Sequence, residues 1–234
     1  MLNSSFSFLI RCSQTGEVWL FNCPDGCQQF VSKLQVRLNQ INHIVINSLK
    51  TNEIGGLVGL LSSLSLNDRI QNINLYGPPG LLTYINLARK YSKTTFKYQL
   101  NVYIHQYTTI HKYGNFHLYI YPQNLYKNDL QYIFVEKERQ GRFQSCKAEL
   151  YGLSPGPIYG KLKMHNKYIL PDGTIIAGKY FTNMYIKGIQ VLYYQEKYSF
   201  RINHELSDRP YYTFRYKCNT SSIENNILGS NYLY

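Results

Sequence analysis

A polar loop between a short apolar strand and an apolar helix carries the side chains best suited to chemistry. Ile44 to Ile46 is β-branched and predicts a buried strand, and Gly55 and Gly56 open the apolar helix that follows. The loop between them offers a hydroxyl, an ammonium, an amide and a carboxyl group, on Ser48, Lys50, Asn52 and Glu53. Because α/β folds place their chemistry at the carboxyl ends of such strands, the sequence predicts a functional site here.

The composition indicates a globular protein that is attracted to phosphate. The chain has 234 residues, 44% of them hydrophobic, which is enough for one sizeable domain. It contains no run of about 18 apolar residues, so we expect no membrane span. A net charge of +12 favours salt-sensitive binding to nucleic acid. An AT-rich genome would also enrich Lys, Asn, Ile and Tyr, so charge alone leaves both explanations open.

The cysteines predict reduced thiols rather than a metal knuckle. They are odd in number and scattered, at Cys12, Cys23, Cys27, Cys146 and Cys218. Cys23 and Cys27 are close in the sequence, but no second pair completes a zinc site. We therefore expect buried free thiols in a reducing compartment.

Strands and helices are predicted to alternate around this loop. The hydrophobic pattern and the turn residues predict strands at 6–11, 17–21, 73–76, 102–104 and 116–121, and helices at 30–38 and 84–91. The first two strands meet at Thr15 and Gly16 and read as a hairpin. Mixed strands flanked by helices predict layered sheets of the α/β class.

Several runs in a specific order resemble a known family. They are residues 44–66, 76–80 (YGPPG), 132–143 (YIFVEKERQGRF), 151–163 (YGLSPGPIYGKLK) and 170–173 (LPDG). Together they resemble ribonuclease Z, the tRNA 3′-processing nuclease of the metallo-β-lactamase superfamily. The resemblance covers most of residues 3 to 196 and the rest thinly. It implies one αββα-sandwich domain of the α/β (α+β) class over residues 1–234, truncated at its N-terminal strand and in its C-terminal part.

The resemblance also implies a tRNA-binding arm within about residues 139–175. Gly156 and Pro157 would fix a kinked backbone, and Lys161 and Lys163 would contact phosphates. The residues expected to bind precursor tRNA are Arg139, Arg142, Gly156, Pro157, Lys161, Lys163 and Arg215. Alternatively, Gly156 and Pro157 shape a packed loop, and the lysines are ordinary solvated side chains.

The positions that correspond to the zinc ligands of the family hold residues that are poor zinc ligands here. Its ligand positions correspond to Ser48, Lys50, Asn52, Glu53, Leu125, Glu196 and Tyr211. Lys50 would place a positive charge where a dication should bind, so we expect no zinc cofactor and no activity of the chain alone. Glu53 and Glu196 could hold one hard cation between them. Alternatively, Glu53 is an acid that the helix dipole favours at a helix start.

Three functions remain open on these residues. The first is a tRNA-binding protein without catalysis; the second is a subunit of a homodimer, or of a heterodimer with an active ribonuclease Z. The third is a residual metal-dependent tRNA 3′-endoribonuclease, whose weak catalytic candidates are His204 and Glu205. His204 also fits an ordinary surface histidine. A decaying gene without function is a further possibility.

The chain also suggests where the protein is found. It resembles open reading frames of red-algal plastid genomes, which agrees with the AT-rich composition. Residues 1–12 lack the order of a secretory signal or of an Arg-rich presequence. We therefore expect a plastid-encoded protein that works in the plastid. The missing N-terminal strand predicts an open sheet edge, which is a reason to expect a partner.

Overall fold

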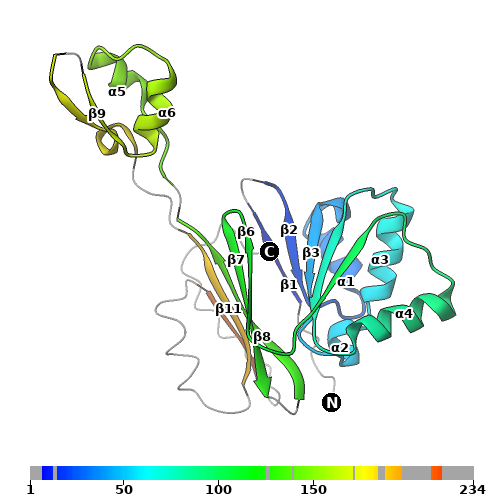
Figure 1. Cartoon of the computed structure of the whole chain (residues 1–234). Coiled ribbons are helices and arrows are strands. Elements are labelled where there is room, and N and C mark those ends of the chain that lie inside the picture. The colour runs from blue at the N-terminus through cyan, green and yellow to red at the C-terminus, as the bar shows by residue number, and fades with distance from the viewer. Residues whose placement is uncertain are drawn as a thin grey trace. The chain divides into compact units, whose positions relative to one another are not determined.

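A computed structural model describes residues 7–12, 15–124, 127–138, 140–170, 172–183, 188–196 and 212–217 of the chain (Figure 1). The chain divides into two compact units. The first comprises Met1–Tyr113, Leu118–Phe134 and Gln190–Tyr234, and the second comprises Gly114–His117 and Val135–Ile189. The predicted arm, about residues 139–175, lies within the second unit.

The first unit contains a five-stranded sheet in the order β1-β2-β3-β4-β5. Its strands are β1 (Phe8–Arg11), β2 (Val18–Phe21), β3 (Ile41–Val45), β4 (Ile73–Gly77) and β5 (Leu100–Ile104). β1 and β2 form the predicted antiparallel hairpin, and β2 to β5 run parallel to one another. The carboxyl ends of β2, β3 and β4 therefore meet at one edge of the sheet, where the predicted polar loop begins.

Helices cover the face of this sheet that is turned away from the second sheet (Figure 1). The elements are α1 (Cys27–Lys33), the 3-10 turn η1 (Leu38–Gln40), α2 (Thr51–Ile54), α3 (Leu57–Leu66) and α4 (Leu81–Ser92). Leu57, Leu60 and Leu64 of α3 are fully buried in one core cluster with the strand residues Ile44 and Leu75. Their spacing of three and four residues places them on one helical face.

The predicted helix at 30–38 is wrong in its bounds. It begins three residues earlier, at Cys27, and it ends at Lys33. Gln35 adopts a left-handed backbone with φ of 55°, which is incompatible with a continuing α-helix. Across the residues that the structure describes, no helix combines the length and the apolar character that a membrane span needs.

A second five-stranded sheet has the order β12-β11-β8-β7-β6. Its strands are β6 (Thr109–Tyr113), β7 (Phe116–Asn124), β8 (Lys127–Glu136), β11 (Gln190–Glu196) and β12 (Tyr212–Lys217). β6 has no counterpart among the predicted strands. Only Ile110 of its five residues is aliphatic, so it lacks an apolar alternation strong enough to be recognised.

Aromatic side chains pack the two sheets face to face. Trp19 of β2 lies 5.2 Å from Phe134 of β8, measured between ring centroids, in an edge-on arrangement. Phe8 of β1 contacts Tyr193 of β11 at 5.7 Å. Such pairs add to the stability that their buried area provides. The first unit thus has a helical layer and two packed sheets among its described residues, in agreement with the predicted layered α/β sandwich.

The second unit is built around a small core of its own. It contains α5 (Ser145–Leu150), α6 (Pro157–Lys163), β9 (Lys167–Ile169), β10 (Ile175–Ala177) and the 3-10 turn η2 (Gly178–Phe181). Leu162 of α6 and Phe181 of η2 are buried together with Ala148. A Cβ on Gly178 would lie 1.9 Å from the Leu162 carbonyl oxygen, so glycine lets η2 pack directly on α6.

Candidate functional site

Hydrogen bonds between backbone groups connect the segments that follow β2 and β3. The Cys23 N–H donates to the Glu53 carbonyl oxygen at 2.7 Å, and the Gly56 N–H donates to the Cys23 carbonyl oxygen at 2.9 Å. A Cβ on Gly56 would lie 2.2 Å from the Pro24 carbonyl oxygen. The glycine at position 56 therefore allows the loop after β2 to pack against the start of α3.

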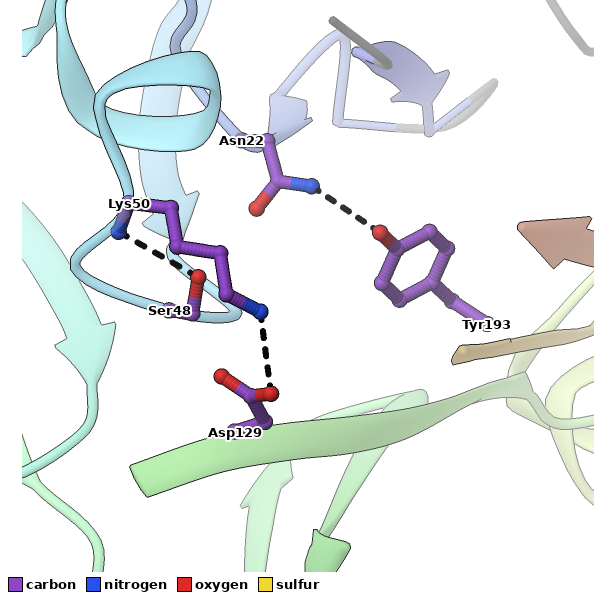
Figure 2. A network of polar contacts seen from close by, with 5 residues as sticks. All are labelled: Asn22, Ser48, Lys50, Asp129 and Tyr193. Atoms are coloured by element: carbon purple, nitrogen blue, oxygen red, sulfur yellow. Dashed lines mark hydrogen bonds and ion pairs between the residues drawn. The ribbon is translucent and has the colours of Figure 1, made fainter. Parts of the chain in front are cut away.

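Asn22 joins three elements at this edge. It is buried and has a left-handed φ of 57°, a conformation that asparagine tolerates better than most residues. Its Oδ1 accepts the Asn47 N–H at 3.0 Å, and its Nδ2 donates to the Tyr193 hydroxyl at 3.3 Å (Figure 2). The side chain thus links the end of β2 to the loop after β3 and to β11 of the second sheet.

Lys50 connects the same loop to β8. Its Nζ lies 3.0 Å from Oδ2 of Asp129, and its own N–H donates to Ser48 Oγ at 3.3 Å (Figure 2). The Leu130 N–H donates to the Asn47 carbonyl oxygen at 3.0 Å. Asp129 was not among the expected site residues, because a partner 79 positions away in sequence gives no spacing signal.

Glu53 is a buried carboxyl group beside this ion pair. It is 7% exposed, and burial is the main cause that raises its pKa above the usual range. A hydrogen bond from Ser48 and the charge of Lys50 act in the opposite direction. Glu53 lies in the first turn of α2, as the helix-start interpretation predicted. Its Oε2 has no hydrogen-bond partner among the described residues.

The donors on the loop do not fit a two-zinc centre. Zinc sites use imidazole, thiolate and carboxylate ligands, whereas the loop supplies a hydroxyl, an amide, one buried carboxyl and an ammonium that is already paired. Within the described part of the chain, no group of three or more His, Cys, Asp or Glu side chains could hold a metal ion. The positive charge of Lys50 would also repel a dication at this point.

Several of the expected site residues cannot be placed. Leu125, His204, Glu205 and Tyr211 lie outside the described residues, as does Arg139. Glu196 and Arg215 have described backbones only, on β11 and β12. The proposed cation site between Glu53 and Glu196 therefore stays a prediction.

The expected arm residues lie on the surface of the second unit. Arg142, Lys161 and Lys163 are exposed. Both lysines are in the last turn of α6, where positive charge also suits the helix dipole. Leu162 between them is buried, so the two lysines flank the buried side of the helix.

At Gly156 and Pro157, where a kinked backbone is expected, the chain changes from extended to helical. Gly156 is extended, with φ of 176°, and Pro157 begins α6. Proline suits this position because the first helical N–H has no partner within the helix. Four further exposed lysines, absent from the predicted RNA-binding set, lie in the same unit: Lys137, Lys147, Lys167 and Lys179. A count of charge along this segment would have found them.

The cysteines follow the prediction in part. Cys12, Cys23 and Cys27 are free and buried, as expected, and a hydrogen bond between Cys23 and Cys27, together with burial, raises the pKa of Cys23. Cys146 is free but exposed, because it lies on the solvent side of the short helix α5. Cys218 lies outside the described residues.

Comparison with known proteins yields relatives over most of the chain, although no family model matches it. The chain is 35% identical to the uncharacterized protein ycf56 of Porphyra purpurea over 182 residues, covering 77% of this chain and 68% of the relative. It is 36% identical to the ribonuclease Z of Rippkaea orientalis over 190 residues, covering 80% of this chain and 60% of that protein. A solved structure, the short form of human tRNase Z, aligns over 57% of each chain with 26% identity and a TM-score of 0.49.

Proposed function

The chain belongs to the ribonuclease Z-like family of the metallo-β-lactamase superfamily, and on that premise we propose that it binds precursor tRNA without a catalytic metal centre of its own. The observation that carries the proposal is the Lys50–Asp129 ion pair at 3.0 Å. An ammonium that is paired with a carboxylate of β8 occupies the loop where a hydrolase of this family would need metal ligands. The chain spans only 60% of the length of the ribonuclease Z from Rippkaea orientalis.

Charge supports the tRNA part of the proposal. The chain carries 25 Lys and Arg residues against 13 Asp and Glu residues. In the second unit, Arg142, Lys161 and Lys163 are exposed. Exposed cations of this kind bind phosphate backbones through the release of counterions, with little dependence on base sequence. The second unit would therefore position the tRNA body, and specificity would come from its shape.

A residual metal-dependent tRNA 3′-endoribonuclease is the alternative. One observation favours it, because Oε2 of the buried Glu53 has no partner among the described residues and could face a cation. A cation there would also meet the charge of Lys50, which makes this the weaker candidate.

Two further proposals concern the setting of the protein. It would act in plastids, since two relatives carry the plastid gene name ycf56. It would also pair with a second copy or with an active ribonuclease Z, and so offer its basic second unit to a shared tRNA. Size-exclusion chromatography with light scattering, with and without an active ribonuclease Z, tests the pairing.

Binding of a 3′-extended precursor tRNA across a series of salt concentrations tests the central proposal. The triple variant Arg142→Ala, Lys161→Ala, Lys163→Ala should bind about tenfold or more weakly, with a salt slope shallower by about 3. The matched control removes three exposed lysines of the first unit, Lys33, Lys90 and Lys112. Equal losses in both variants would indicate nonspecific charge attraction, and unchanged affinity in the first would remove the role of the second unit.

A further inference from the structure

Two histidines meet just beyond the carboxyl end of β5. His105 follows β5 of the first sheet, and His111 lies in β6 of the second sheet. Their Nε2 atoms are 3.2 Å apart. The short turn between the two strands therefore brings two potential metal-ligand nitrogens together from different sheets.

The geometry of this pair suits a shared metal ion. With metal–nitrogen distances of about 2.0–2.1 Å, two nitrogens of a tetrahedral site are about 3.3–3.4 Å apart. The ring centroids lie 4.8 Å apart with 74° between the ring planes. A straight N–H···N bond would hold the centroids further apart, because both rings would extend directly away from it. The rings are instead inclined to one another, which is compatible with a metal ion bound by both nitrogens.

A neighbouring hydroxyl group is compatible with the form of His105 that a metal requires. Thr109 Oγ1 lies 2.9 Å from His105 Nδ1 and can accept a hydrogen bond from an Nδ1–H, in the tautomer whose free lone pair is on Nε2. The backbone is also held, because the His105 N–H donates to the Gly77 carbonyl oxygen at 3.0 Å. An outer partner on the second ring nitrogen is the usual support of a metal-binding histidine.

His111 is held by aromatic rings and keeps access to solvent. It packs edge-on against Tyr76 at 5.1 Å and Tyr103 at 5.3 Å between centroids. His105 is 5% exposed, whereas His111 is only partly buried. Burial and the neighbouring His111 lower the pKa of His105 to about 4, and burial lowers that of His111. Both rings are thus neutral near pH 7, the form that coordinates metal.

We propose that His105 and His111 form a two-imidazole site for a divalent transition metal such as Zn²⁺, Co²⁺ or Ni²⁺. These metals bind imidazole nitrogen well, and water would complete the coordination. The described residues offer no third His, Cys, Asp or Glu at this point, so the site is open. Because one ligand comes from each sheet, a bound metal would cross-link the two sheets at this end.

The test is a Co²⁺ and Zn²⁺ titration of the full chain with Cys146→Ser and Cys218→Ser, which removes competing thiols. We expect one metal ion per chain and a visible Co²⁺ spectrum without a thiolate charge-transfer band. His105→Ala and His111→Phe should each weaken binding about tenfold or more. His165→Ala, a histidine of the second unit that contacts Thr182 Oγ1 at 2.7 Å, should leave it unchanged.

A measurement on the unsubstituted histidines guards against variants that fail to fold. Nitrogen-15 NMR of the imidazoles should show Zn²⁺ shifting the Nε2 signals of His105 and His111. Absence of any shift, or binding that both histidine variants retain, would overturn the proposal and leave a hydrogen-bonded pair.

Discussion

The Nζ of Lys50 lies 3.0 Å from Oδ2 of Asp129, and this ion pair joins the loop after β3 to strand β8 of the facing sheet. Lys50 is half exposed, whereas Asp129 is only 14% exposed. The carboxylate is therefore shielded from water more than in an ordinary surface pair. A positive side chain thus takes a fixed place in the loop on which a metal centre would depend.

The strength of this ion pair is measurable by a double-mutant cycle. Lys50→Ala and Asp129→Ala, alone and together, should give a coupling free energy of about 0.2–1 kcal/mol that decreases with added salt. The matched control is Lys97–Asp68, a pair whose side chains are 63% and 80% exposed. Urea unfolding of both sets gives the comparison. A coupling no larger than that of the control pair would contradict a structural role for Lys50.

Any substitution of Gly56 should destabilise the fold, because the surrounding backbone leaves no space for a Cβ atom. Gly56→Ala would bring a methyl group to 2.2 Å from the Pro24 carbonyl oxygen, and backbone must move to relieve this. We expect a loss of about 1–3 kcal/mol in the free energy of unfolding. Gly59→Ala is the control within α3, the helix that follows Gly56, and there the nearest atom is the flexible Gln28 Nε2 at 3.3 Å. There, alanine should be neutral or stabilising by up to about 1 kcal/mol. Equal losses would contradict the packing described.

Replacing Asn22 should lower the free energy of unfolding. Asn22→Ala deletes the acceptor of the buried Asn47 N–H and places alanine at a φ of 57°. An unpaired buried donor costs about 1–3 kcal/mol, and the left-handed backbone adds about 1–2 kcal/mol. Asn22→Gly separates the two effects, because glycine removes the acceptor without the backbone strain. In thermal and urea unfolding, the wild type should be the most stable, followed by Asn22→Gly and then by Asn22→Ala. If Asn22→Ala were more stable than Asn22→Gly, the left-handed backbone would not contribute as described.

The lowered pKa of His43 predicts that the folded protein loses stability in acid. Burial, with a smaller effect of Arg69, lowers its pKa from 6.5 to about 3. The unfolded chain binds a proton here below about pH 6.5, whereas the folded chain does so only near pH 3, so stability decreases as pH falls through this window. The slope from this residue approaches about 1.4 kcal/mol per pH unit. His43→Phe, which keeps a ring stacked on Trp19, should flatten the curve of unfolding free energy against pH by that amount. Parallel curves would refute the argument.

Local patterns in the sequence predict much of the fold but little of the site. The β-branched run at Ile44 and the glycines at 55 and 56 indicated β3 and the start of α3, because hydrophobic runs and helix starts are local signals. The predicted polar loop over residues 47–53 is wrong in its extent, because Thr51–Ile54 forms the short helix α2. The Asp129 partner of Lys50 and the meeting of His105 with His111 depend on how two sheets pack. Spacing along the chain carries no information of that kind. The left-handed turn at Gln35, which ends α1, likewise has no Gly or Pro to announce it.

The most direct test of the central claim follows binding and cleavage of one labelled precursor tRNA with a 3′ extension, in the same samples, with Zn²⁺ or Mn²⁺ added. We expect a retarded complex at low salt in which the RNA stays intact over the time that an active ribonuclease Z needs to remove the extension. Metal-dependent release of the extension that Glu53→Gln abolishes would contradict it. So would a failure to bind the precursor at all.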